Sequence, residues 1–378
     1  MDFDLSEEHK IFQNTAAQFA QKEIAPLGAE HDEKEEYPRW IFKRAGELGF
    51  LGIPYPEQYG GTGPDTIALC IFTEEASRAD AGIGAGLVVQ NTVGTSPVHS
   101  FGSEEIKQKY LVPAIKGDFV GCFCLTEPNV GSDVSSVETM AKEDGDRYII
   151  NGSKLFVSNG LIADYAIVAA RTEKDKGHKG ITLFLLETDS AGLTRRGLKK
   201  LGIRAQDIAE FVFEDCQVSK DNILGEKGQG FYHLMATVQK TRIIVGSASV
   251  GLARAAFETA LRYAKERNQF GQPIGKFQAV QFKLADMAME IELASLMTYK
   301  AAWLNDTGEK CIKEASMAKL YASEMVNRVA YNALQIHGGY GYMREYPMER
   351  YFRDARIMEI FEGTSEIQRV IIARQLGL

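Results

Sequence analysis

The segment QIHGGYGYMREYPMERYFRD, residues 335–354, is the most informative part of the sequence about the fold. It leaves a helical stretch through a Gly-rich turn that carries Gln, Arg and several aromatic side chains. A second such turn, RNQFGQPIGKFQ at residues 267–278, leaves the preceding long helix in the same way. Glycine at these turns permits unusual backbone conformations and lets the chain approach a ligand closely. Both turns are therefore candidate polar sites at helix ends.

The sequence around these turns divides the chain into three blocks. Apolar residues at helical spacing predict a helical N-terminal block over residues 1–118. Short β-branched and aromatic runs separated by Gly, Asn and Asp predict a middle β-domain, a barrel or sandwich, over residues 119–228. Long helices predict a C-terminal four-helix bundle over residues 229–378, completed by a final helix after Glu362. At 378 residues the chain is long enough for this α+β multidomain architecture.

Local signals place several element boundaries. Ser6 begins a first helix that Pro26 closes, and Pro38 opens a second helix that Gly49 ends. In the middle block, the pair at residues 151–152, Asn-Gly, lies between two strand-like runs. This pair is a strong hairpin signal, so we expect a tight turn there.

Charge and composition exclude several classes of function. The formal net charge of −8 argues against nucleic acid as a main partner, because phosphate binding needs a basic face. The five cysteines are odd in number and contain no CxxC motif, which predicts reduced core thiols in a cytoplasmic protein. Cys122 and Cys124 share one face of a strand, where burial is expected. The six histidines show no metal-ligand spacing, so no metal site is predicted.

The sequence predicts no targeting or membrane segment. The N-terminus, MDFDLSEEHK, is acidic and lacks signal or transit character. No apolar run is expected to reach membrane-spanning length.

The common nucleotide and hydrolase motifs are missing. AGIGAGL at residues 81–87 lies in a helical region and lacks the third glycine of a dinucleotide fingerprint. GEKGQG at residues 225–230 is better explained as a linker between the β-domain and the bundle. Neither a P-loop nor a GxSxG elbow occurs, so the ordinary Rossmann and hydrolase folds are weakly supported.

Two polar segments of the middle block are candidate binding sites. CLTEPNVGSD at residues 124–133 ends an apolar strand and then turns, and hydroxyl and backbone N–H groups on such a turn can bind a flat cofactor or a phosphate. The alternative is a turn whose Ser, Thr and Asp side chains satisfy one another. FVSNG at residues 156–160 places an aromatic ring and a hydroxyl alternately on a strand.

The segment IFEGTSEIQR, residues 360–369, places an acid directly before a predicted helix. Ser365 is the expected N-cap, with Gln368 three residues later as in a capping box. One explanation for Glu362 is stabilisation by the helix dipole. The other is a general base beside a substrate, with Gly363 allowing close backbone approach. These ten residues alone leave both explanations open.

Taken together, these segments resemble the acyl-CoA dehydrogenase family over essentially the whole chain. The resemblance lies in the helical–β–helical order, the LTEP..GSD turn, the long Gly-rich segment and the terminal FEGTSEIQR. It departs from the family at Val130, where a small residue is usual. The long Gly-rich segment matches the family at seven positions, namely Gln335, Gly338, Gly339, Gly341, Glu345, Arg350 and Asp354.

The resemblance implies FAD as the cofactor and an acyl-CoA thioester as the substrate. Thr126 should hydrogen-bond the flavin ring, and Ser158 should place its hydroxyl near flavin N5, where the family usually has Thr. Ser132 should contact the cofactor or the CoA pyrophosphate. The other implied flavin neighbours are Phe123, Leu125 and Phe156. Residues implied to reach the FAD of a neighbouring subunit are Arg267, Gln269, Phe270, Gln278, Gln335, Gly338 and Gly339, and those on the adenine side are Thr364 and Glu366.

Glu362 falls on the family's catalytic base. It is implied to remove the α-proton while flavin N5 takes the β-hydride, with the enolate oxygen held by the N–H of Glu362 and a ribityl hydroxyl. Some relatives carry the base at the position of Thr241 instead, and threonine there favours Glu362. Thr241 and Arg242 resemble medium-chain members slightly more than short-chain ones. Implied substrate contacts are Ser132, Thr241, Arg242 and Gly363.

The resemblance also implies a homotetramer, a dimer of dimers, that passes electrons to electron transfer flavoprotein. Two alternatives remain open at this point. One is an oxidase of the same fold that uses oxygen, and the other is a non-catalytic acyl-CoA-binding scaffold. The segment VVQNTVG, residues 88–94, is expected to form the floor of the acyl pocket, whose length the sequence does not determine.

Overall fold

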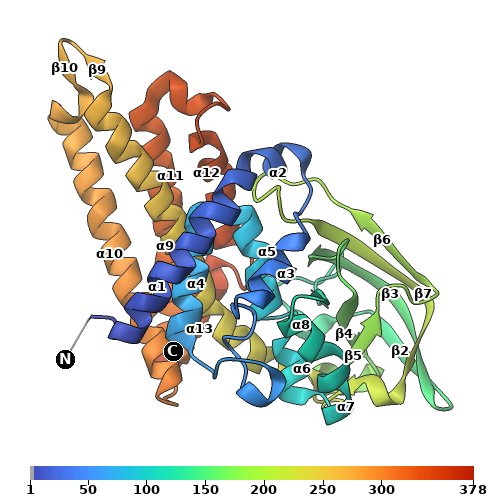
Figure 1. Ribbon diagram of the computed structural model, residues 1–378. Coiled ribbons are helices and arrows are strands. Elements are labelled where there is room, and N and C mark those ends of the chain that lie inside the picture. The colour runs from blue at the N-terminus through green and yellow to red at the C-terminus, as the bar shows by residue number, and fades with distance from the viewer. Residues whose placement is uncertain (1–3) are drawn as a thin grey trace.

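The computed structural model describes residues 4–378, and Figure 1 shows the expected three blocks. The strands lie on one side, the long C-terminal helices lie on the other, and the N-terminal helices lie between them. The predicted order of helical, β and helical blocks is therefore confirmed. The N-terminal helices are α1 (Glu7–Phe19), α2 (Gly28–Lys34), α3 (Trp40–Glu47), α4 (Thr66–Ala79), α5 (Ala81–Asn91), α6 (Ser96–Phe101), α7 (Glu104–Ile106) and α8 (Val112–Ile115).

The first helix begins as predicted but does not end at Pro26. Ser6 caps α1 by accepting a hydrogen bond from the N–H of His9 at 3.2 Å. After α1 the chain continues through a π-helical turn (Ala20–Ile24) and a 3₁₀ turn (Ala25–Leu27) into α2. Pro26 is tolerated because it lies in the first turn of a new helical segment, where a missing N–H has no intrahelical partner to lose.

The middle block is one sheet that folds into two facing halves. Its strands run in the order β6-β7-β3-β2-β4-β5-β8, and β1 pairs with β4 in parallel. Only one residue pair, Met140 with Arg171, joins β2 to β4, so the sheet divides there. Buried side chains from both halves pack against each other, among them Cys122 and Cys124 as predicted. The strands are β1 (Gly121–Cys124), β2 (Met140–Asp144), β3 (Arg147–Ser158), β4 (Tyr165–Arg171), β5 (Ile181–Glu187), β6 (Leu193–Gly197), β7 (Ile208–Ser219) and β8 (Ile223–Leu224).

The hairpin prediction at Asn151 and Gly152 is wrong, because both residues lie inside β3. The hairpin between β2 and β3 turns at residues 145–146 instead. Gly152 has a φ of 143° at a register shift between β3 and β7, and the Asn151 side chain bonds Asp215 on β7. The Asn-Gly pair thus forms a β-bulge, which requires the same backbone freedom as a tight turn.

The C-terminal block contains three long helices. The helix that packs alongside α9 and α10 is not the final helix, which was predicted to complete the bundle. The final helix, α13, packs against α11, whereas α4 from the N-terminal block packs along α9 and α10. A Cβ at Gly251 on α9 would stand 2.1 Å from the carbonyl oxygen of Glu74 on α4, so glycine permits this close approach. The elements are α9 (Gly230–Glu266), β9 (Asn268–Gln269), β10 (Gln272–Pro273), α10 (Gln278–Asp306), α11 (Ile312–His337), α12 (Met348–Ala355) and α13 (Ser365–Gln375).

Helix α9 corrects the expectation that no apolar run reaches membrane-spanning length. It has 37 residues, and its most apolar window has a mean hydropathy of 1.2, so it passes that test by length and composition. However, 78% of that window is buried within the protein. We conclude that α9 is the core helix of a soluble protein.

A buried cluster of charged residues joins the three blocks through α12. The Arg353 guanidinium donates to the carboxylate of Asp32 on α2 at 2.7 Å. Arg350 lies 3.7 Å from Asp80, whose carboxylate caps α5. The Asp354 carboxylate accepts the backbone N–H of Ile203 in the loop between β6 and β7. The segment at residues 335–354 therefore fixes the position of both other blocks.

Asp354→Asn should weaken the dependence of stability on pH. Burial raises the pKa of Asp354 to about 7, and the charges of Asp80 and Asp32 add to this effect. In the unfolded chain the pKa of an Asp side chain is about 3.9. Ionisation of Asp354 therefore lowers the free energy of unfolding as pH rises from about 4 to about 7, by at most about 4 kcal/mol. Asparagine does not titrate and keeps an acceptor for Ile203.

Thermal unfolding midpoints at about pH 5 and about pH 8 test this expectation. The parent protein should lose more stability between these two pH values than the Asp354→Asn protein. Replacing exposed Asp189 by Asn is the matched control and should leave the parental difference unchanged. Equal pH differences in the parent and Asp354→Asn proteins would contradict the assigned titration.

Candidate active site

Glu362 lies in a turn of unusual backbone conformation between a 3₁₀ turn (Arg356–Glu359) and α13. Its φ is 53° and that of Gly363 is 90°, so two successive residues are left-handed. A non-glycine residue in this region is strained and persists only where its surroundings hold it. The predicted N-cap is off by one residue, because Thr364 rather than Ser365 caps α13 through the N–H of Ile367.

The Glu362 carboxylate faces α9 and α11. Thr241 on α9 donates its hydroxyl to Glu362 Oε2 at 2.6 Å, while Oε1 has no hydrogen-bond partner among residues 4–378. Burial raises the pKa of Glu362, opposed by the Thr241 hydrogen bond and by the positive charges of Arg242 and Lys319. A raised pKa moves a carboxylate toward the range in which it can accept a proton near neutral pH.

Two further polar groups beside Glu362 are unpaired. The backbone N–H of Glu362 makes no hydrogen bond within the part of the chain that the structure describes. Arg242 is buried and its Nε also lacks a partner there. Burial lowers the pKa of Arg242, and the charge of Glu362 opposes this. Unpaired buried donors beside an acid leave this site able to bind an anionic or carbonyl oxygen.

The predicted flavin neighbours of the β-domain lie along the end of β1 and the bulged part of β3. The register shift between Lys154 and Val157 expels Phe156, which has a φ of 58° and is 61% exposed. The N–H of Leu155 bonds the carbonyl oxygen of Thr126 at 2.8 Å, so the turn after β1 is tied to this bulge. The partly exposed side chains there are Phe123, Leu125, Thr126 and Ser158.

Buried charges hold this polar turn in shape. Lys154 is fully buried and donates to Glu127 at 2.7 Å and to the carbonyl oxygen of Leu125 at 3.0 Å. Glu127 also accepts the N–H groups of Glu138 and Thr139.

Ser132 lies further along on an exposed loop. The turn is therefore partly self-satisfied, as one alternative required, but the hydroxyls of Thr126, Ser132 and Ser158 have no partner among residues 4–378.

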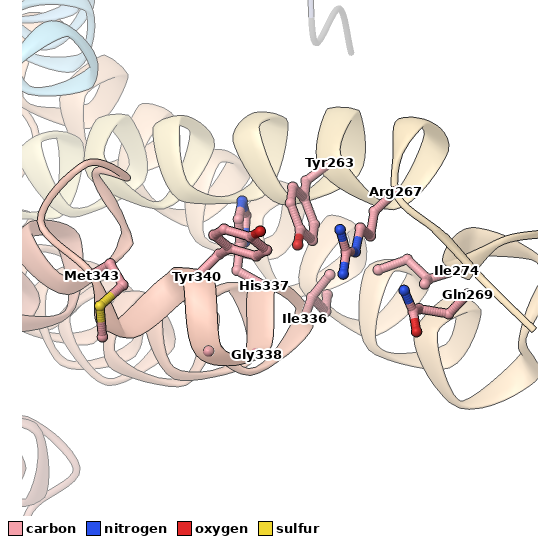
Figure 2. A pocket seen from close by; sticks show the side chains of 10 residues that line it. Tyr263, Arg267, Gln269, Ile274, Ile336, His337, Gly338, Tyr340 and Met343 are labelled. Carbon is pink, nitrogen blue, oxygen red and sulfur yellow. The ribbon is translucent and has the colours of Figure 1, made fainter.

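A second group of predicted residues lines a surface pocket at the ends of α9 and α11 (Figure 2). The pocket has a volume of about 500 Å³. The guanidinium of Arg267 lies 5.3 Å from the centre of the Tyr340 ring, and the rings of Tyr263 and His337 stack at 4.2 Å. A Cβ at Gly338 or Gly339 would meet nothing within 4 Å. Of the predicted residues, Arg267, Gln269, Gly338 and Gly339 line the pocket, Phe270 and Gln278 lie on the adjoining hairpin and α10, and Gln335 is exposed on the last turn of α11.

The Glu362 turn and the pocket lined by Arg267 are far apart within one chain. Thr241, which touches Glu362, lies on α9, and Arg267 directly follows the last residue of this helix. At 1.5 Å per residue, 26 residues of helix separate them by about 39 Å. Thr364 and Glu366 belong to the Glu362 end, where Thr364 also caps α13.

Sequence reasoning missed two buried residues that contact the Glu362 turn. Lys319 on α11 donates to the carbonyl oxygen of Gly363 at 2.8 Å, and Gln368 on α13 donates to the same oxygen at 2.9 Å. Lys319 follows Ala315 and precedes Ala322 at helical spacing, so a lysine on the apolar face of a helix was the available signal. The sequence indicated Gln368 only as a capping-box residue. Its side chain does fold back toward the start of α13, where it donates to the carbonyl groups of the turn.

Family models match nearly the whole chain. The acyl-CoA dehydrogenase N-terminal, middle and C-terminal domains match residues 6–118, 122–216 and 228–377. The probable acyl-CoA dehydrogenase YngJ of Bacillus subtilis is 48% identical, and the alignment covers 100% of both chains. The mitochondrial short-chain specific acyl-CoA dehydrogenase of Mus musculus is 44% identical over 99% of this chain and 91% of its own.

Solved structures share the fold over their full length. Butyryl-CoA dehydrogenase from Megasphaera elsdenii has a TM-score of 0.96 and 41% identity, with 100% of both chains covered. A chain in a structure described as the electron transferring flavoprotein of Acidaminococcus fermentans has a TM-score of 0.97 and 44% identity, covering 100% of this chain and 99% of that one. The prolyl acyl carrier protein oxidase AnaB has a TM-score of 0.94 and 36% identity, covering 99% and 100%.

The fold and the site together define a flavin-dependent oxidoreductase. The chain belongs to the acyl-CoA dehydrogenase family, and it is an FAD-dependent acyl-CoA dehydrogenase. The residues present fit this cofactor, because the hydroxyls of Thr126 and Ser158 are unpaired within residues 4–378 and Gly338 and Gly339 leave their pocket open. Among the same described residues, no group of His, Cys, Asp and Glu side chains could hold a metal ion.

Proposed function

We propose that Glu362 is the general base that removes the α-proton of an acyl-CoA thioester. The observation that carries this proposal is the geometry of its turn, which joins a carboxylate of raised pKa to an unpaired N–H of the same residue. Because Thr241 holds Oε2, Oε1 is the oxygen available to accept the proton. The N–H of Glu362 then donates to the thioester oxygen as negative charge develops on it. When bound, FAD supplies the acceptor for the β-hydride.

The proposed substrate is a short acyl chain. Support comes from the full-length likeness to a short-chain specific dehydrogenase and a butyryl-CoA dehydrogenase, rather than from the slight sequence resemblance to medium-chain members. Ser132, Arg242 and Gly363 are proposed CoA-thioester contacts. The buried, unpaired guanidinium of Arg242 supports an anionic or carbonyl ligand beside Glu362. The proposed pocket floor, residues 88–94, contains the end of α5.

The proposed electron acceptor is electron transfer flavoprotein. The likeness to a chain in a structure described as such a flavoprotein supports this choice. The likeness to an oxidase makes oxygen the alternative acceptor to be tested. We further propose that the protein acts in the cytoplasm, because its five cysteines are all free and buried, as expected in a reducing compartment.

The proposed assembly is a homotetramer in which each FAD crosses a subunit boundary. The separation of about 39 Å along α9 between Thr241, beside Glu362, and Arg267 supports this arrangement. The outer face of α10 supports it too, because a stripe of large apolar side chains there is 42–62% exposed. Its members are Phe282, Met289, Leu296 and Trp303, at intervals of seven residues, with Leu293 between them. A seven-residue apolar repeat is the pattern by which helices pair with other helices.

Glu362→Gln should abolish most catalysis while leaving binding intact. It keeps the size of the side chain and the backbone N–H but removes the proton acceptor, so flavin reduction by butyryl-CoA should slow by at least on the order of 10²–10⁴-fold. Stopped-flow absorbance under anaerobic conditions measures the rate, and the spectral change on mixing reports binding. Glu362→Asp should lie between the two, since the carboxylate retreats by one methylene. A parental rate in Glu362→Gln would place the base elsewhere.

Thr241→Val should make the enzyme less active on the acid side of its pH profile. The variant removes the hydroxyl that stabilises ionised Glu362, so the pKa of Glu362 should rise further. We expect the acid limb of kcat/KM to move to higher pH, with activity recovered above neutrality. Thr237→Val is the matched control, because Thr237 lies one turn earlier and donates to the His233 carbonyl instead. A limb that moves equally in both variants would argue against this coupling.

Arg267→Ala should weaken FAD retention and assembly together. In the proposed tetramer Arg267 makes a charge-assisted contact to the pyrophosphate of an FAD that the neighbouring subunit holds, so the cofactor and the interface stabilise each other. Gel filtration with absorbance detection measures the flavin content and the size of each species. Exposed Lys276, in the 3₁₀ turn that follows β10, provides the control substitution, Lys276→Ala. Loss of FAD from a fully intact oligomer would instead place the whole site within one chain.

A further inference from the structure

Lys319 is a charged side chain with no exposure to solvent. It lies on α11, and its one hydrogen bond within residues 4–378 is the bond from Nζ to the carbonyl oxygen of Gly363 at 2.8 Å. Removing an ammonium group from water is costly unless nearby charges and hydrogen bonds offset the loss. An apolar side chain would avoid that cost, so the lysine at this position calls for a specific explanation.

The Gly363 carbonyl has a second buried donor. The side-chain amide of Gln368 donates to it at 2.9 Å and also lies 3.3 Å from the carbonyl oxygen of Glu362. A Cβ on Gly363 would stand 2.8 Å from this amide nitrogen, so the clamp requires glycine there. Side chains from α11 and α13 thus hold the carbonyl groups of both left-handed residues.

Four ionisable groups face Lys319 from the elements packed around it. They are Glu362 in the turn, Glu359 before it, Glu366 on α13 and Arg242 on α9. Burial lowers the pKa of Lys319 to about 8, and the attraction of Glu362 is the largest opposing effect. The charge of Lys319 in turn favours the ionised form of Glu362. At neutral pH the lysine therefore acts on both the shape of the turn and the charge of the carboxylate.

We propose that Lys319 is a positioning residue for Glu362, a role that rests on the proposed function of Glu362 as the base. Its ammonium group fixes the Gly363 carbonyl, so the turn keeps the left-handed conformation that directs the carboxylate and leaves the Glu362 N–H free. Its positive charge also favours the ionised form of Glu362 before the substrate arrives. Gln368 forms the uncharged half of the same clamp and should affect geometry alone.

Three variants of the flavin-loaded enzyme separate these two effects. Lys319→Met removes the charge and the donor but keeps the length of the side chain. Gln368→Met removes the other donor without changing the charge. Ser323→Ala is the matched control, because Ser323 is buried one turn further along α11 and its hydroxyl donates to the Leu320 carbonyl, away from the Glu362 turn. Anaerobic flavin reduction by butyryl-CoA is followed from about pH 6 to about pH 9.

For Lys319→Met we expect a rate near neutral pH that is lower by on the order of 10²-fold, since misplacement of a reacting group by about 1 Å has that effect. Its acid limb should move to higher pH, so that part of the activity returns in alkaline buffer. Gln368→Met should be slower at every pH, with an unmoved limb, and Ser323→Ala should match the parent. Infrared difference spectra give an independent readout, in which the protonated Glu362 band, assigned by its loss in Glu362→Gln, persists to higher pH in Lys319→Met.

The outcomes distinguish this inference from the proposed function. If Glu362→Gln keeps the parental rate, the proposed function fails, whatever the lysine does. If Glu362→Gln is inactive but Lys319→Met has the parental pH profile and infrared band, only the positioning role fails. Lys319→Gln, which restores a donor without the charge, serves as a second variant should Lys319→Met misfold. Failure of both lysine variants to yield flavin-loaded protein would assign Lys319 to stability and overturn the positioning role.

Discussion

The buried contacts of α12 set the geometry on which the rest of the structure depends. Arg353 and Arg350 bind carboxylates of the N-terminal block, and Asp354 accepts a backbone N–H of the middle block. Breaking one partner of a buried charged pair leaves the other uncompensated, so these contacts strongly favour one arrangement of the blocks. Glu362 follows Asp354 by eight residues. The same segment that locks the β-domain in place therefore also sets where the carboxylate lies relative to β1 and β3.

Three residues proposed to bind the cofactor or carry the chemistry have a strained backbone. Phe156, Phe270 and Glu362 are all non-glycine residues with positive φ. Each occupies a feature that holds it there: a bulge in β3, a short hairpin, or a turn clamped from two helices. Strain of this kind persists only when the surroundings over-determine it, and it places a side chain where a relaxed strand or helix would not. The rigid scaffold thus directs an aromatic ring and an acid out of regular structure.

The sequence was sufficient for the order of the blocks, because Gly-rich turns and long apolar periodicities are local signals. Predictions from the sequence failed where the local structure depends on a contact with residues far away in the chain. Asn151 and Gly152 form a bulge because β7 pairs across them, which no local turn signal reveals. The helix packed along α9 is α4. This packing depends on the close approach of Gly251 to the Glu74 carbonyl, two residues that are far apart in the sequence. Lys319 was missed because a single lysine in a helix is usually solvated.

The distribution of charge and distance supports the proposal that catalysis depends on more than one chain. Around Glu362, the buried cations Arg242 and Lys319 both attract its carboxylate, and Nε of Arg242 has no partner within residues 4–378, so the site can stabilise added negative charge. Arg267, which is proposed to hold the FAD of the neighbouring subunit, lies about 39 Å from Thr241 at the end of the same helix. In the proposed assembly one subunit therefore supplies the base and its neighbour supplies the clamp for the cofactor. Because each binding step then stabilises the other, loading of FAD and association of subunits are thermodynamically linked.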